Sequence, residues 1–340
     1  MTRKPSRKSR RSAARAHERT AGWRAAARQN SAWLIGGAAA AALAAGAFLN
    51  HANARRAEAA SPPAGSFVEV DGVRLHYVDR GTGTPVVLLH GNGVTLQDFE
   101  ASGVLGLAAA SHRVIAFDRP GFGYSERPRS TVWTPAAQAA LLAAALEKLG
   151  VEGAVVVGHS WATMAALAMA LDHPRAVAGL VLLSGYYYAT ARPDVLAFGL
   201  PAVPLLGDLM AHTVSPLAGL LIGPAAVKAS FSPAAVDRRF PGVPLAMMLR
   251  PGQVHAAAAD TAAMVPAAIA LSRRYGELRM PVIVMAGDGD LIAHAGRHAE
   301  RVVKDIEGAA LRIVPAQGHL FHYAVPEQVA AAIDEVAARA

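Results

Sequence analysis

Val155-Val156-Val157-Gly158-His159-Ser160-Trp161-Ala162 is the stretch that decides the fold. Its three valines predict a buried strand, and the alanine-rich residues 163–170 that follow predict a helix. A serine at a tight turn between strand and helix is the arrangement of a nucleophile elbow, because the turn exposes the hydroxyl above the sheet. The helix N-terminus beneath it favours developing negative charge. Gly158 and Ala162 are small, as two closely approaching backbones require. Ser160 is therefore a candidate nucleophile.

Short strands and helices alternate on both sides of this turn, from Ser66 onward. The predicted strands are 67–70, 73–78, 85–89, 113–117, 155–157, 177–183, 280–285 and 311–314, and the clearest helices are 135–149, 163–170, 297–306 and 326–338. Asp71-Gly72 between the first two strands predicts a hairpin. This alternation predicts an α/β fold with a doubly wound, mostly parallel sheet. It stops at 186–277, so the sheet domain is expected to comprise 66–185 and 278–340.

The charge of the chain is concentrated at its N-terminus. The formal net charge is +8, yet residues 1–30 contain ten Lys or Arg and a single acid, Glu18. The rest of the chain is therefore almost neutral, which argues against nucleic acid as a partner of the folded body. We expect residues 1–31 to form a basic disordered tail. The sequence contains no cysteine, which excludes disulfides and thiolate metal sites.

An apolar run follows the tail, because residues 32–49 carry no charge. Eighteen residues at about 1.5 Å each approach the hydrocarbon thickness of a bilayer, so we expect a single membrane-spanning helix. The basic flank before it predicts that the N-terminus stays inside and the body lies on the non-cytoplasmic side. Two alternatives remain: a signal peptide cleaved near Ala52-Asn53-Ala54, and a soluble alanine-rich helix. Residues 50–65, ending in Ser61-Pro62-Pro63-Ala64-Gly65, are expected to form a linker.

Five motifs occur in a fixed order through the body. They are His90-Gly91-Asn92-Gly93, Asp118-Arg119-Pro120-Gly121-Phe122-Gly123, Gly158-His159-Ser160-Trp161-Ala162, Gly287-x-x-Asp290 and Gly318-His319. With these motifs residues 66–340 resemble the α/β-hydrolase fold-1 family, and the order Ser, Asp, His is the one used by that fold. The resemblance implies that the interruption at 186–277 is a helical cap over the substrate pocket.

The resemblance also implies a catalytic triad. A serine hydroxyl is a weak nucleophile at neutral pH, so it needs an adjacent base, and that base needs an orienting carboxylate. Ser160 would be the nucleophile, His319 the base and Asp290 the acid. His322 lies near the base in sequence and Asp288 near the acid, but each is the weaker candidate. The resemblance further implies that the oxyanion is bound by the backbone N–H groups of Asn92 and Trp161.

Two departures from the family pattern concern small residues. Ala162 replaces the usual glycine at the end of the elbow motif, and Ala293 lies near a position where relatives often carry proline. The segment 118–123 is interpreted as a structural turn that supports the sheet and takes no part in the chemistry.

The expected activity is hydrolysis of a small or medium apolar ester, because the segment 186–277 is rich in apolar residues. No cofactor or metal is expected. Haloalkane dehalogenases share Asn and Trp at the positions of Asn92 and Trp161, but they attack with a carboxylate, whereas Ser160 would form an unreactive ether. The same triad would also serve a cofactor-free haloperoxidase or perhydrolase, or an acyltransferase. A hypothesis of another class is a catalytically silent, membrane-anchored binding module, which would be expected to lack a triad member.

Overall fold

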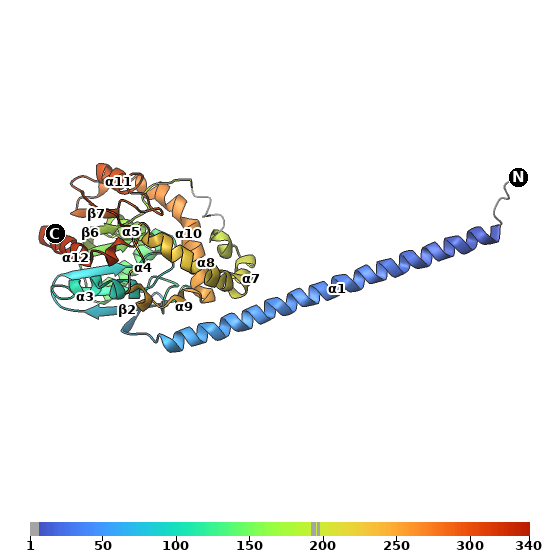
Figure 1. Ribbon diagram of the computed structural model, residues 1–340. Helices are drawn as coiled ribbons and strands as arrows, with labels where there is room; N and C mark the ends of the chain where they lie inside the picture. Colours follow the sequence, from blue (N-terminus) through green and yellow to red (C-terminus); the bar gives the residue numbers. More distant parts are fainter. Residues whose placement is uncertain (1–6, 192–194, 196–197) are drawn as a thin grey trace. The chain divides into compact units, whose positions relative to one another are not determined.

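The computed structural model describes residues 7–191, 195 and 198–340, and the chain divides into two compact units, Met1–Leu49 and Asn50–Ala340. The first helix, α1, runs from Arg7 to Ala60 (Figure 1). The expectation of disorder up to residue 31 was therefore wrong from Arg7 on, and it falls outside the described residues for 1–6. The expected linker is also shorter, since helix continues through 50–60. Alanine and arginine are strong helix formers, and the first breakers after the run are Pro62 and Pro63.

The sheet has eight strands in the order β1-β2-β4-β3-β5-β6-β7-β8. The strands are β1 (Ser66–Val70), β2 (Val73–Arg80), β3 (Pro85–Leu89), β4 (Arg113–Phe117), β5 (Ala154–His159), β6 (Val177–Leu183), β7 (Val282–Gly287) and β8 (Ala310–Val314). β2 is antiparallel to both of its neighbours, and all the other pairs are parallel. The predicted α/β fold with a mostly parallel sheet is thus confirmed. The hairpin is also present, with positive φ at Asp71 (49°) and Gly72 (75°).

Helices cover both faces of the sheet (Figure 1). One face packs against α4 (Pro135–Lys148), α5 (Ala162–Asp172) and α11 (Ala299–Asp305). The other face packs against α2 (Gln97–Ser102), α3 (Val104–Ala108) and α12 (Pro326–Arg339). In β5, Val156 belongs to the first core, and Val155 and Val157 belong to the second. All three valines are fully buried, which is why this strand is an unbroken apolar run.

The described part of the segment between β6 and β7 is helical. It contains η2 (Leu200–Ala202), α7 (Leu206–His212), α8 (Val214–Phe231), η3 (Phe240–Gly242), α9 (Leu245–Met248), α10 (Pro251–Ser272) and η4 (Tyr275–Glu277). Two short 3-10 helices lie elsewhere, η1 (Pro174–Ala176) and η5 (Phe321–Tyr323). By length and composition, Trp33–Ala60 of α1 could cross a membrane, and so could α8 and α10. The long helix α10 contacts α5, α7 and α8, and so connects this segment to the sheet domain.

Candidate active site

Ser160 lies at the end of β5 in a strained backbone conformation. Its φ is +54°, in the left-handed region that non-glycine residues rarely adopt. The turn is held by a hydrogen bond of 2.8 Å from the Ser160 N–H to the carbonyl of Leu183 on β6. A Cβ atom at Gly158 would lie 2.9 Å from the carbonyl oxygen of Ala162, so only glycine fits there. This geometry presents the Ser160 side chain above the C-terminal edge of the sheet.

Two loops bring the other predicted triad residues to Ser160. The Oγ atom of Ser160 is 2.8 Å from Nε2 of His319, which follows β8. The Nδ1 atom of His319 is 2.8 Å from Oδ2 of Asp290, which follows β7. A Cβ at Gly318 would lie 2.3 Å from the carbonyl oxygen of Ser232, so glycine is required immediately before the histidine. The three side chains therefore form one hydrogen-bonded row.

Asp290 is fixed by its own loop. Its Oδ1 accepts hydrogen bonds from the backbone N–H groups of Ile292 (2.8 Å) and Ala293 (2.9 Å). Burial acts to raise the pKa of Asp290, but His319 and these N–H donors outweigh it and hold the pKa well below its usual range. Proline at 293 could not donate this hydrogen bond, so the departure at Ala293 provides a donor to the acid. Asp288 is exposed to solvent, as expected of a turn residue.

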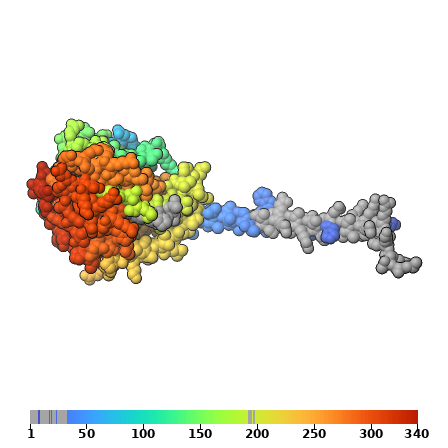
Figure 2. Space-filling view, turned by 90° about the horizontal axis from the view of Figure 1, so that it is seen from above, coloured from blue at the N-terminus to red at the C-terminus, as the bar shows by residue number. Residues whose placement is uncertain are grey.

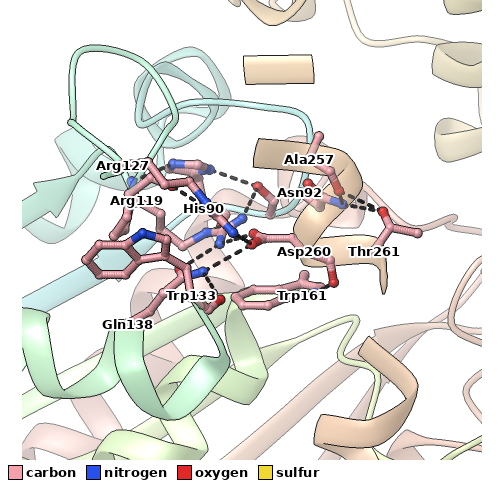
Figure 3. A network of polar contacts seen from close by, with 12 residues as sticks. His90, Asn92, Arg119, Arg127, Trp133, Gln138, Trp161, Ala257, Asp260 and Thr261 are labelled. Atoms are coloured by element: carbon pink, nitrogen blue, oxygen red, sulfur yellow. Dashed lines mark hydrogen bonds and ion pairs between the residues drawn. The ribbon is translucent and has the colours of Figure 1, made fainter. Parts of the chain in front are cut away.

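In each of the two predicted oxyanion residues, the backbone N–H group and the side chain have different partners. Among the described residues, the backbone N–H groups of Asn92 and Trp161 donate to no acceptor, which leaves them available to a substrate oxygen. The Asn92 amide group donates to the carbonyl of Ala257 and to the hydroxyl of Thr261 on α10, each at 3.0 Å. The Trp161 indole donates to the carbonyl of Asp260 at 2.7 Å. Both side chains are therefore bound to α10 (Figure 3).

A buried ionic network joins α10 to the sheet domain behind these residues (Figure 3). Nη1 of Arg119 is 2.6 Å from Oδ2 of Asp260, and both side chains are completely buried. Oδ1 of Asp260 accepts from Arg127 at 3.0 Å and from Gln138 at 3.1 Å. Arg119 also donates to the carbonyls of His90 and Gly91, in the loop that carries Asn92. The segment 118–123, interpreted from sequence as a structural turn, thus supplies the arginine that links the loop to α10.

A second buried cluster lies beneath His319. Asp98 accepts from Nε2 of His322 at 3.2 Å and from the Tyr323 hydroxyl at 2.9 Å, which fixes the chain just after His319. Burial opposes ionisation of Asp98, but His322 and the other donors outweigh it and lower its pKa to about 2. The ring of His159 is hydrogen-bonded through Nε2 to the carbonyl of His319 at 3.2 Å. Burial, with His322 and His319 nearby, lowers the pKa of His159 well below its usual value, so this ring is neutral.

The ligand atoms of Asp98, His159 and His322 lie within 4.8 Å of one another, which is a grouping that could hold a cation. The hydrogen bonds of Asp98 to His322 and Tyr323 already account for its burial. We therefore interpret the cluster as support for the loop that carries His319. His322 belongs to this support and lies outside the row formed by Ser160, His319 and Asp290.

A cavity of about 340 Å³ opens onto Ser160 and His319. Its walls come from the loop that carries Asn92, the turn at Ser160 and the helical segment. The apolar lining includes Val94, Tyr186, Phe198, Val227, Phe240, Leu245, Met248, Met264, Ile292 and Leu320, and the main polar side chains are Asn92, Ser230 and Thr261. No Asp, Glu, Lys or Arg of the described residues lines it. The cavity is therefore suited to an uncharged, largely apolar molecule.

Sequence reasoning missed Asp98, Asp260 and His159. Asp260 did leave a signal, because it is an acid within the apolar stretch 256–268 and is followed after four residues by Met264 on the same helix face. A carboxylate on the buried side of a helix requires a cationic or hydrogen-bonding partner. The partner, Arg119, is more than a hundred residues away in sequence, so it could not be identified without the fold.

Comparison with known proteins agrees with this fold. The family model described as the alpha/beta hydrolase fold matches residues 84–324. The 2-hydroxymuconate semialdehyde hydrolase of Pseudomonas putida is 35% identical over 123 residues, 36% of this chain and 44% of that enzyme. Haloalkane dehalogenase 2 of Mycobacterium tuberculosis is 30% identical over 125 residues, 37% of this chain and 43% of that enzyme. The chain thus spans less than half the length of these curated relatives.

Among solved structures, Est816, described as an N-acyl homoserine lactone degrading enzyme, is similar to this chain with a TM-score of 0.60 and 26% identity. The match covers 79% of this chain and 99% of that structure. About a fifth of this chain therefore lies outside the match.

Proposed function

Because the chain belongs to the α/β-hydrolase family, we propose that it is a serine hydrolase that cleaves a small or medium apolar ester through an acyl-enzyme. The observation that carries the proposal is the row of Ser160, His319 and Asp290, joined by two contacts of 2.8 Å. Nucleophile, base and orienting acid are each within hydrogen-bond reach of the next, as acyl transfer by a serine requires.

In the proposed reaction, Nε2 of His319 takes the hydroxyl proton as Ser160 attacks the ester carbonyl. The oxyanion that forms is bound by the free N–H groups of Asn92 and Trp161. Protonated His319, stabilised by Asp290, then gives the proton to the departing alcohol and leaves the acyl group on Ser160. Water enters, His319 removes its proton, and attack on the acyl-enzyme releases the carboxylic acid and restores the serine.

The walls of the cavity support an apolar ester as the substrate. The volume of about 340 Å³ is near the lower end of ligand pockets, roughly 300–1,000 Å³, which favours small or medium acyl groups. The cavity has no charged side chain among the described residues, which disfavours substrates that carry a free amine or carboxylate on the part that enters it. Lactones have the same reacting carbonyl, so the similarity to a lactone-degrading enzyme is consistent with this chemistry.

Dehalogenation is disfavoured despite the similarity to a haloalkane dehalogenase. Attack by a serine hydroxyl on a haloalkane would form an ether that water does not open. The two side chains that dehalogenases use to hold halide are also occupied here, since the Asn92 amide group and the Trp161 indole donate to α10.

We also propose that α1 anchors the enzyme in a membrane by one pass, with the N-terminus inside and the body on the non-cytoplasmic side. The support is the uncharged run 32–49 within a helix of spanning length, preceded by the basic residues of 1–30. The test is alkaline extraction of membranes, followed by protease treatment of intact cells or spheroplasts. Release by alkali would refute anchoring, and protection of the body from external protease would refute the orientation.

A fluorophosphonate probe tests the catalytic proposal. We expect covalent labelling of the full-length protein that is lost in Ser160→Ala. Ser230→Ala is the matched control, because Ser230 lines the same cavity but its hydroxyl donates to the carbonyl of Ala226. Labelling that survives in Ser160→Ala, or that is absent from folded wild-type protein, would refute the proposed nucleophile.

A further inference from the structure

The residues from Phe198 to Phe231, which include α7 and α8, form an unusually apolar surface, here called the cap face. Its exposed large apolar side chains are Phe198, Leu200, Val203, Leu205, Leu206, Leu209, Val214, Leu217, Leu220, Leu221 and Ile222. The only formally charged residues in this segment are Asp208 and Lys228, and Asp208 is paired with Arg129. An exposed patch of this kind marks a surface that contacts an apolar partner. Figure 2 shows the segment as the yellow surface of the body.

The residue that follows the apolar run, Asn50, is fastened to this same face. Asn50 is the first residue after the uncharged run and belongs to the compact unit of the body. Its side-chain N–H₂ donates to the carbonyls of His212 (2.9 Å) and Thr213 (2.7 Å), and Asn50 is buried. His212 ends α7 and Thr213 precedes α8, so the attachment lies at the junction of the two cap helices.

Further contacts hold the rest of residues 50–61 on the body. Glu58 forms a salt bridge with Arg250 at 3.0 Å, and the Tyr124 hydroxyl donates to the carbonyl of Ser61 at 2.5 Å. If residues 32–49 cross a bilayer, Asn50 lies where the chain leaves it. The junction of α7 and α8 is then at the lipid surface, whatever angle α1 makes with the body.

The cap face also continues into the cavity that contains Ser160. The first half of α8 exposes Leu217, Leu220 and Leu221 to solvent, and its second half lines the cavity with Ala226 and Val227. Phe198 is 55% exposed and lines the cavity as well. An apolar path therefore runs along the cap from the outer surface to the nucleophile.

We propose that the cap face is immersed in the lipid surface of the membrane that α1 crosses, and that the substrate reaches Ser160 from the lipid. The second part rests on the proposed esterase function and makes the substrate class more specific: esters that partition into the bilayer. A bilayer is favoured over a second copy of the chain because Asn50, the residue that follows the proposed membrane span, is bound to this face. Immersion of the cap face removes its leucine side chains from water, which favours the lipid-bound state.

The absence of cysteine permits a site-specific test on the full-length protein. Single cysteines at Leu205 and Leu221, which are 84% and 83% exposed, are labelled with an environment-sensitive fluorophore. Matched controls are Leu107→Cys on α3 and Ile313→Cys on β8, which are exposed apolar positions outside the cap face. The labelled proteins are reconstituted into phosphatidylcholine–phosphatidylglycerol vesicles with and without acyl-chain nitroxide lipids.

We expect the fluorophores at 205 and 221 to shift to the blue and to be quenched by the nitroxide lipids, and those at 107 and 313 to remain unquenched. Equal quenching at all four sites, or quenching at none, would overturn the proposal. A blue shift at 205 and 221 without lipid quenching, and growing with the protein-to-lipid ratio, would assign the face to a second copy and overturn it also. Because no outcome depends on turnover, this readout is separate from the proposed catalysis.

The substrate part has its own measurement. Leu220→Asp/Leu221→Asp is compared with Leu107→Asp/Ile313→Asp on a long-chain ester embedded in vesicles and on a water-soluble acetate ester. We expect the cap variant to lose activity several-fold on the embedded ester alone, and the control pair to keep the wild-type ratio. An unchanged ratio of embedded-ester to soluble-ester activity in the cap variant would overturn delivery from the lipid. If the wild-type protein hydrolyses neither ester, the proposed esterase function is refuted instead.

Discussion

The Arg119–Asp260 pair allows a sharp test of how α10 is held to the sheet domain. We consider Asp260→Asn, which keeps the size of the side chain and removes its charge. Asp260 is completely buried, and its carboxylate accepts from Arg119 at 2.6 Å, Arg127 at 3.0 Å and Gln138 at 3.1 Å. In the variant the amide oxygen can face only some of these donors, and the amide nitrogen must face another donor. Arg119, which is also completely buried, would lose its counter-ion.

The expected cost is large because one member of a buried pair remains charged. Removing one partner of such a pair costs about 3–5 kcal/mol, since the other charge stays desolvated. Asp172→Asn is the matched control, because it removes the same charge from a pair with Arg274 whose side chains are 37% and 35% exposed. Solvent screens that pair, so its loss should cost about 0–1 kcal/mol.

The assay is equilibrium urea unfolding of the full-length protein in mild detergent, followed by tryptophan fluorescence. Trp161 donates to the Asp260 carbonyl and should report the loss of this contact directly. We expect the free energy of unfolding to fall by several kcal/mol in Asp260→Asn and by less than one in Asp172→Asn. If the two variants lose equal stability, the ionic network does not hold α10 as we describe.

Three further predictions concern the site. Asp290→Asn should lower kcat on a chromogenic ester roughly 10⁴-fold, because the amide no longer stabilises protonated His319, and a loss below tenfold would contradict the role of the acid. Thr261→Val removes one of the two acceptors of the Asn92 amide group, so we expect the free energy of unfolding to fall by about 1 kcal/mol and kcat to fall several-fold. Unchanged kinetics would show that this contact with α10 does not position the loop that carries Asn92. Burial of His90, with Arg119 close by, lowers its pKa to about 4, so the unfolded chain, with a histidine pKa of about 6.5, binds the proton first as the pH falls. The contribution of neutral His90 to the free energy of unfolding is therefore fully present above pH 6.5 and declines by about 3 kcal/mol as the pH approaches 4. A free energy of unfolding that stays level from pH 7 to 4.5 would contradict this prediction.

The sheet domain could be predicted from sequence because its signals are local. The valine run before Ser160 is fully buried on both sides, and Asp71-Gly72 adopts the positive φ angles that its hairpin needs. Resemblance to the family placed Asp290 and His319 next to Ser160, and their separations in the structure fit that placement. The roles of these three residues remain predictions until labelling and kinetics test them.

The remaining features depend on contacts between distant parts of the chain. Asp260 and Arg119 are partners across the boundary of the helical segment, and nothing in the sequence near either residue identifies the other. Asp98 and His322 are also partners that lie far apart in sequence. The sequence alone therefore disfavours His322 as the base but does not reveal that it pairs with Asp98. The sequence predicts a linker over 50–65 because of Pro62 and Pro63, but helix α1 continues to Ala60, since the first helix breakers come only after it.

The attachment of Asn92 to Ala257 and Thr261 has a consequence for recombining related enzymes. A chimera that exchanged residues 186–277 for those of another family member would transplant the acceptors of the Asn92 amide group and the counter-ion of Arg119 together. Such a hybrid should remain active only when the incoming segment supplies equivalents at 257, 260 and 261. Specificity in this fold would then be inherited as a block, with the wall of the pocket and the oxyanion donor changing together.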